Sequence, residues 1–299
     1  MCGIVGFFTK TPVYQPRLGA CLSAMLIEMT DRGPDSAGVA VYRNPGRRGG
    51  TKLSLFSPVE GYDWSTLGSD LTVHVGHVSS LEVRASHAVL DVAAEFSAVK
   101  DWLAAHHPEV RVMSAGTHIE IFKEKGLPGL VAGRFRFDEF AGTHALGHTR
   151  MATESAVTTE HSHPFSTGLD LCLVHNGSLS NHNRLRRCLE REGIEFQTDN
   201  DSEVASGYLT WRLSQGASLD EALEAAIADL DGFYTFAVGT KEGFAVLRDP
   251  IACKHAVLAE TDDWVAMATE YRSIAVLPGA EDARIWEPAP GRIYSWAHA

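Results

Sequence analysis

Runs of apolar residues, bounded by glycine, proline and charged residues, predict the secondary structure of the first third of the chain. A short apolar run at the N-terminus (GIVGFF) predicts a strand, and the next run (RLGACLSAMLIEM) has helical spacing until Gly33 and Pro34 end it. Two more apolar runs, separated by a turn rich in Gly and Pro, predict two further strands. The predicted strands cover residues 3–8, 36–42 and 52–56, and the predicted helix covers residues 17–29.

The middle third of the chain, from about residue 60 to 140, has a mixed pattern. It predicts a helix near residues 89–105, followed by strands over VRVMSA and HIEIFK. Nothing in this third indicates a particular chemistry.

The second half combines clear strands with clear helices. Residues 169–175 (LDLCLVH) are nearly all apolar, which predicts a strand buried on both faces. Because strands gather at both ends of the chain, with helices between and after them, the order favours layered sheets with helices outside over alternating βαβ units. Helices are predicted over residues 182–192, 202–214 and 218–230, and strands over residues 144–150 and the segments FYTFAVG, GFAVLRD, HAVLAE, DWVAMAT and GRIYSWA.

Composition indicates an ordinary globular protein and argues against several partners. The 299 residues are 44% hydrophobic and 21% charged, without repeats or long linkers, so we expect one domain. The net charge is 26 − 38 = −12 and no basic run exceeds two residues, which argues against nucleic acid as a partner. No apolar run approaches the ~18 residues of a membrane helix, and no charged leader precedes an apolar run. We therefore expect neither a membrane span nor a signal peptide.

Cysteine and histidine positions argue against a metal site. No two cysteines form a CxxC pair, which argues against a disulfide framework, zinc or an iron–sulfur cluster and favours the reducing cytoplasm. The pairs His161/His163 and His106/His107 have no carboxylate at ligand spacing. There is also no GxGxxG or GxxxxGK[ST] motif to indicate nucleotide binding. The cysteines are at positions 2, 21, 172, 188 and 253.

Cys2 follows the initiator methionine directly and precedes Gly-Ile-Val-Gly. Removal of Met1, which is easy when the second residue is small, would leave a free α-amine beside a thiol. A thiol attacks as its thiolate, and an α-amine with an ordinary pKa of roughly 7.7–8.0 can accept the thiol proton near neutral pH. Cys2 is therefore a candidate nucleophile that carries its own base. The alternative is a small core residue of the first strand.

Four segments rich in polar residues lie at the predicted ends of strands. Each by itself is explained by turn or helix-cap chemistry, since Asn-Gly is a common hairpin turn and residues 199–203 can cap the next helix. The four segments are RGPDSAG (32–38), GHTRMAT (147–153), HNGSLSN (175–181) and TDNDSE (198–203).

In this order behind Cys2, the four segments resemble the class II glutamine amidotransferase domain of the N-terminal-nucleophile hydrolases. The resemblance runs from Cys2 to about Glu203 and continues more weakly through the segments DGFY (231–234) and RDP (248–250). It implies an α+β fold of four layers, αββα, and hydrolysis of the side-chain amide of glutamine. It implies no metal and no organic cofactor in this chain.

The resemblance also implies a role for each matching residue. Arg150 would hold the α-carboxylate of glutamine, a bidentate task that suits a guanidinium, and Asp201 would pair with the α-ammonium. The side-chain amide of Asn176 and the backbone N–H of Gly177 would form an oxyanion hole for the thioester chemistry at Cys2.

Four more residues match positions with supporting roles in the family. Thr153 and His163 match positions that line the glutamine pocket. Arg32 and Asp35 match positions that order the loop around the N-terminal amine.

Two features resemble the free-standing amidotransferase subunits of glutamate synthase-like complexes, a group that includes N-methylglutamate synthase. One is the pair of segments IFKEKG (121–126) and GTHALGHTRMATES (142–155). The other is the long stretch 60–140, which we interpret as a family-specific insertion within a single domain, 2–299. The resemblance implies that partner synthase subunits receive the ammonia and carry FMN and iron–sulfur clusters.

Other functions remain open from the sequence. They are a stand-alone glutaminase or an amidotransferase subunit of another pathway, a different N-terminal-nucleophile hydrolase, and a non-catalytic regulatory subunit on the same scaffold. Arg150 and Asp201 favour an amino-acid substrate over an acyl amide or peptide. Cys2, Asn176 and Gly177 together favour catalysis over a purely regulatory role.

Overall fold

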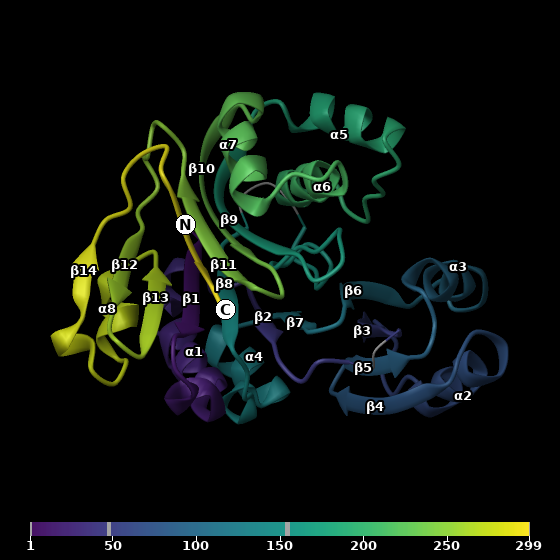
Figure 1. The fold of residues 1–299 in the computed structure, drawn as a ribbon. Helices are drawn as coiled ribbons and strands as arrows, with labels where there is room; N and C mark the ends of the chain where they lie inside the picture. The colour runs from purple at the N-terminus through teal and green to yellow at the C-terminus, as the bar shows by residue number, and fades with distance from the viewer. Residues whose placement is uncertain (1, 47–48, 153–155, 299) are drawn as a thin grey trace.

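Two antiparallel β-sheets lie face to face between two layers of helices, and a third sheet stands to one side (Figure 1). The computed structural model describes residues 2–46, 49–152 and 156–298. The α+β class and the αββα layering predicted from the sequence are confirmed.

The larger sheet has seven strands, and its middle strand β1 begins one residue after Cys2. All seven residues of β1 are buried, as the apolar N-terminal run predicts. The strand order is β14 (Arg284–Trp286), β12 (Val257–Glu260), β13 (Trp264–Ala268), β1 (Gly3–Thr9), β8 (His144–Arg150), β2 (Ser36–Tyr42) and β7 (Ile119–Lys125).

The second sheet has four strands, and its edge strand β9 packs on the helix layer. Residues 171–174 are buried on both faces, as predicted, since Cys172 and Val174 face the other sheet while Leu171 and Leu173 face the helices. The strand order is β15 (Ile293–Ala297), β11 (Gly243–Arg248), β10 (Gly232–Gly239) and β9 (Cys172–Leu179).

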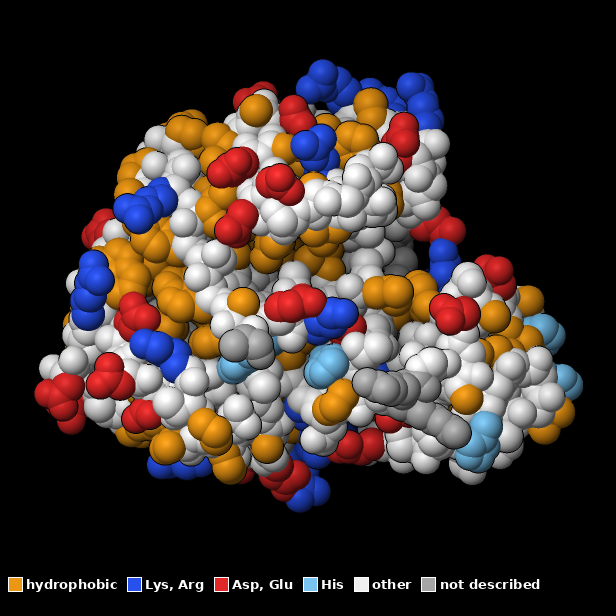
Figure 2. Space-filling view, viewed as in Figure 1, with side chains coloured by type: hydrophobic (Ala, Val, Ile, Leu, Met, Phe, Trp, Pro, Cys, Tyr) orange, Lys and Arg blue, Asp and Glu red, His pale blue; other side chains and the backbone are white. Residues whose placement is uncertain are grey.

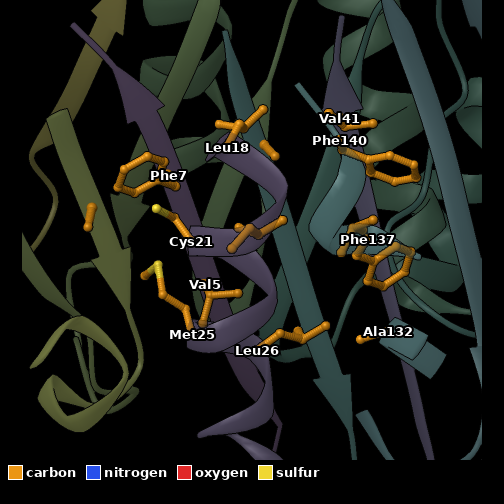
Figure 3. Packing of buried hydrophobic residues seen from close by; sticks show 14 of the residues in the cluster. Val5, Phe7, Leu18, Cys21, Met25, Leu26, Val41, Ala132, Phe137 and Phe140 are labelled. Atoms are coloured by element: carbon orange, nitrogen blue, oxygen red, sulfur yellow. The ribbon is translucent and has the colours of Figure 1, made fainter. Parts of the chain in front are cut away.

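Alternate residues of β1 enter two separate cores. Ile4 and Phe8 join the core between the two sheets. Val5 and Phe7 point toward helix α1 (Leu18–Ile27), where Figure 3 shows them beside Cys21 and Met25. Because both faces of β1 are covered, the start of this strand is held firmly in place.

Helices cover the outer face of each sheet. On the larger sheet these are α1, α4 (Pro128–Phe135) and α8 (Tyr271–Ala275). On the smaller sheet they are α5 (His182–Arg191), α6 (Asp201–Ser214) and α7 (Leu219–Asp229). Helix α5 carries four arginines, and basic side chains gather over it at the top right of Figure 2.

The third sheet has its own core and two helices of its own. Leu53, Leu67, Leu90 and Leu103 are among the residues buried in this core. The carboxylate of Asp170 ties the end of this unit to the start of β9, because it accepts backbone hydrogen bonds from residues 117–119. The elements are β4 (Val78–Arg84), β5 (His87–Val92), β3 (Thr51–Phe56), β6 (Arg111–Gly116), α2 (Trp64–His74) and α3 (Phe96–His106).

Two predicted elements differ from the structure. The predicted helix over 89–105 is wrong in its first part, because residues 87–92 form strand β5 and helix α3 begins only at Phe96. The predicted strand over 169–175 begins later and runs further. Asp170 has a positive φ of 52°, which turns the chain before Cys172, and the strand continues through Asn176 and Gly177 to Leu179. The Asn-Gly pair is therefore part of a strand and not a hairpin turn.

No helix in the described ranges is long and apolar enough to span a membrane. All five cysteines are free thiols, with Cys21 and Cys172 buried and Cys188 and Cys253 exposed.

Three fully buried histidines make the stability of the fold sensitive to acid. Burial lowers the pKa of His87, His144 and His148 from 6.5 to about 3. Below pH 6.5 these groups take up protons in the unfolded chain but stay neutral in the folded protein, so acid favours unfolding. We expect the thermal midpoint to hold between pH 8 and 7 and to fall from about pH 6.5 to 5, with each histidine contributing up to about 1.4 kcal/mol per pH unit. Thermal unfolding followed by circular dichroism checks this.

The variant His87→Phe is a sharp control for this expectation. The His87 ring packs against Phe56, Phe122 and Phe135, and its Nε2 has no hydrogen-bond partner within the described residues. Phenylalanine removes the proton uptake at little packing cost, so the pH dependence should become shallower. An unchanged dependence in His87→Phe would mean that other groups cause the loss of stability.

Candidate active site

Cys2 immediately precedes β1 and lies beside the end of β8 and beside Asn176 of β9. The register that pairs Gly3 with Thr149 brings Cys2 beside Arg150 at the end of β8. Two side chains donate hydrogen bonds to the carbonyl oxygen of Cys2. The donors are Arg32 Nε and Asn176 Nδ2, and each donor nitrogen lies 3.2 Å from the carbonyl oxygen. The Cys2 residue is partly exposed, and its Sγ lies 3.9 Å from the carbonyl oxygen of Met151. The thiol is therefore held at a fixed point that solvent can reach.

Asn176 and Gly177 lie side by side in β9, opposite the start of β10. Asn176 pairs with Thr235 and is buried, with its amide directed at the backbone of Cys2. Gly177 has a φ of 156°, and a Cβ at this position would meet the carbonyl oxygen of Phe233 at 2.0 Å. No other residue fits there without moving the strand, which explains the glycine. The Asn176 amide thus lies against the backbone of Cys2, and Gly177 is the next residue of the same strand.

Arg150 is almost fully buried, and its Nη1 donates to the carbonyl oxygen of Ala156 over 2.9 Å. Burial lowers the pKa of the Arg150 guanidinium below its usual range, while negative charge at Cys2 and Asp35 counteracts that shift. Asp35 supports the turn after Arg150, because its Oδ2 accepts from the backbone N–H of Ala152 over 2.8 Å. The structure thus brings Arg150 and Asp35 to the same place as Cys2. Thr153 lies outside the described residues.

Asp201 begins helix α6 and contacts the end of the strand that carries Asn176. Its Oδ2 accepts from the backbone N–H of Leu179 over 2.9 Å, and its side chain remains 22% exposed. The carboxylate therefore both holds the end of β9 and stays open to a ligand.

His163 is buried in a cluster with two other histidines and Ser202. Its ring stacks on His148 with a centroid distance of 3.9 Å, and its Nε2 lies 2.9 Å from the Ser202 hydroxyl. The same hydroxyl lies 2.8 Å from Nδ1 of His175. Burial lowers the pKa of His163 well below its ordinary value. His163 is therefore neutral at pH 7 and contacts Ser202, the residue next to Asp201.

Two residues at this end of the sheets were not singled out from the sequence. Glu270 forms a salt bridge of 2.5 Å with Arg32, and this contact lowers the pKa of the Glu270 carboxyl. Ser202 joins His163 to His175, as described above. Glu270 is 238 residues from Arg32 and carries no motif, while the only signal for Ser202 is its place in the segment 198–203.

Two large cavities lie beside the third sheet and not at Cys2. One of about 680 Å³ lies at the far end of β10 and β11, around residues 240–244. Another of about 760 Å³ lies between residues 56–64 and 157–160. Within the described part of the chain, no group of three or more His, Cys, Asp or Glu residues could hold a metal ion.

A family model described as "Glutamine amidotransferase domain" matches residues 148–276. A glutamine amidotransferase-like protein, GlxB, from Rhizobium meliloti (strain 1021) is 55% identical over 299 residues, which is 100% of this chain and 99% of the relative. A putative glutamine amidotransferase from Methanothermobacter thermautotrophicus is 32% identical over 304 residues, covering 98% of this chain and 99% of the relative.

Solved structures share the fold. The glutamine phosphoribosylpyrophosphate amidotransferase from B. subtilis superposes with a TM-score of 0.64 at 19% identity, covering 99% of this chain and 47% of that one. A structure described as the allosteric regulatory enzyme of purine biosynthesis gives a TM-score of 0.60 with the same identity and coverage.

Proposed function

Because the chain belongs to the class II glutamine amidotransferase family, we propose that it hydrolyses the side-chain amide of glutamine at Cys2 and passes the ammonia to a synthase on another chain. The observation that carries the proposal is the 3.2 Å contact between the Asn176 amide and the Cys2 carbonyl, which brings the donor and the nucleophile's residue together. Arg150, from the neighbouring strand β8, meets them there.

The reaction proceeds in two halves on one thiol. After removal of Met1, the α-amine of Cys2 accepts the thiol proton, and the thiolate adds to the carboxamide carbon of glutamine. Asn176 Nδ2 and the N–H of Gly177 stabilise the oxyanion that forms. The amine returns the proton to the departing nitrogen, so ammonia leaves and a γ-glutamyl thioester remains on Cys2. Water then attacks the thioester and releases glutamate and the thiol.

Arg150 and Asp201 select the amino-acid end of the substrate. A guanidinium binds a carboxylate through two parallel hydrogen bonds, and the Asp201 carboxylate attracts the α-ammonium. Free glutamine has both groups, whereas a glutamine within a peptide has neither. Arg32 supports the backbone of Cys2, Asp35 supports the turn after Arg150, and His163 contacts Ser202, the neighbour of Asp201. Thr153 is proposed to line the same pocket.

We propose that the ammonia acceptor is a partner subunit of a glutamate synthase-like or N-methylglutamate synthase complex. Support comes from the segments IFKEKG and GTHALGHTRMATES, which resemble those complexes. The two full-length relatives also match along 99% of their own length, so they are amidotransferase-like proteins of this same size. FMN and iron–sulfur clusters are expected on the partner subunits, with no cofactor in this chain.

Intact mass spectrometry with 6-diazo-5-oxo-norleucine, an electrophilic analogue of glutamine, tests the glutaminase proposal. We expect loss of Met1 and one adduct that maps to Cys2, with protection by excess glutamine. The exposed thiols of Cys188 and Cys253 serve as internal controls, because an unselective electrophile would label them as well. Retained Met1, or labelling elsewhere, would favour a regulatory or scaffolding role.

A further inference from the structure

Lys123 is a buried basic residue on a face of its strand that also carries buried apolar residues. Strand β7 places Lys123 on the same face as Ile119 and Ile121, which belong to the core between the two sheets. Its side chain is only 3% exposed. Burying an ammonium group is costly unless it has close polar partners, so its contacts point to a specific task.

The partners of Lys123 are backbone carbonyls of one short segment. Nζ donates to the carbonyl oxygens of Ser162 over 2.7 Å, Pro164 over 3.1 Å and Glu160 over 3.2 Å. It also lies 4.6 Å from the centre of the Phe165 ring. Because three of these contacts are to backbone atoms, Lys123 fixes the path of the chain over residues 160–165 whatever their side chains are.

The segment 156–165 is the one that holds the proposed glutamine-binding residues in place. At its start, the Ala156 carbonyl accepts from the Arg150 guanidinium. Near its end, His163 stacks on His148 and contacts Ser202, the neighbour of Asp201. The next residue of β7, Glu124, accepts a hydrogen bond from the Thr159 hydroxyl in the middle of the segment. Two residues of β7, Lys123 and Glu124, therefore form hydrogen bonds with this segment.

We infer that Lys123 is a positioning residue for glutamine, which fixes the segment 156–165 in the path that presents Arg150 to the α-carboxylate. This inference rests on the proposed function. Lys123 contacts neither Cys2 nor the oxyanion donors in the structure, so its effect falls on the affinity for substrate and leaves the chemical step largely intact.

The test is the variant Lys123→Met, compared with wild type in glutamine hydrolysis and in the labelling of Cys2 by 6-diazo-5-oxo-norleucine. Losing charge-assisted hydrogen bonds should raise the half-saturating concentration of both compounds about tenfold to hundredfold. The rate at saturation should change by less than about threefold, because the reacting groups stay in place. Lys123→Arg retains a cation with several donors and should recover part of the affinity.

Lys52→Met is the matched control. Lys52, in β3 of the third sheet, is also 3% exposed, and its Nζ donates to the carbonyls of Arg43 and Asn44 and forms an ion pair of 2.5 Å with Glu120. This variant should lose thermal stability but keep the affinity for glutamine. If Lys123→Met does not fold, Lys123→Gln, which retains two N–H donors, takes its place.

Two outcomes would overturn the inference. One is an unchanged half-saturating concentration in the folded Lys123→Met or Lys123→Gln variant. The other is an equal loss of affinity in Lys52→Met, which would indicate general destabilisation. Failure of the proposed function is distinguishable from both, because wild-type Cys2 would then remain unlabelled.

Discussion

Glutamine hydrolysis is expected to fall by at least about 10⁴-fold when Cys2 is replaced with alanine, because the reaction loses its proposed nucleophile. Ammonia release from saturating glutamine measures the effect. Cys2 is partly exposed and precedes the first strand, so the substitution should leave the thermal midpoint nearly unchanged. The loss would then reflect chemistry and not unfolding.

Two matched variants make the Cys2 experiment specific. Cys188→Ala and Cys253→Ala remove the exposed thiols and should retain full activity. If Cys2→Ala kept activity within tenfold of wild type, the nucleophile would have to be another group.

The same experiment can separate the thiol from the amine. A short extension such as Gly-Ser before Cys2 keeps the thiol but converts the α-amine into a peptide N–H, which cannot accept a proton. We expect the extended protein to be as inactive as Cys2→Ala. Full activity in the extended protein would show that a different base accepts the thiol proton.

The strands that position the site could be predicted from local pattern. Strands β2 and β8 have the bounds that the sequence predicts, 36–42 and 144–150, because a segment rich in polar residues marks the start of β2 (32–38) and the end of β8 (147–153). The stretch 60–140 was harder. Its strands and helices are short, and β5 is followed so closely by α3 that the two patterns merge into one apparent helix.

The residues of the candidate site stand out in the sequence as motifs, but the residues that contact and support them do not. Arg150, Asn176 and Asp201 stand in polar segments that interrupt apolar runs, which gives a local signal. Glu270 and Lys123 act through partners far away in sequence, and a contact of that kind leaves no local pattern in a single chain. Lys123 has one local signal in the sequence. It is a charged residue on the face of β7 that also carries Ile119 and Ile121, and the alternation of the two faces along a strand could have revealed it.

The oxyanion hole gives the second large expected effect. Asn176→Ala should lower the rate at saturating glutamine by about 10²–10³-fold, because the amide N–H proposed to stabilise the developing negative charge is lost. The half-saturating concentration should change little, since the proposed function assigns the other end of the substrate to Arg150 and Asp201. Steady-state kinetics separate the two parameters.

Asn181→Ala is the matched control for Asn176. Asn181 lies just beyond the same strand, and its side-chain amide also donates to a backbone carbonyl, that of Asp229 over 2.9 Å. Truncating it should cost some stability at the start of α5 without changing the saturated rate. Asn176→Asp is expected to be at least as inactive as Asn176→Ala, because a carboxylate presents negative charge where the oxyanion forms. A rate in Asn176→Ala within threefold of wild type would mean that the donors lie elsewhere, since the Gly177 N–H alone cannot replace a lost side-chain donor at no cost.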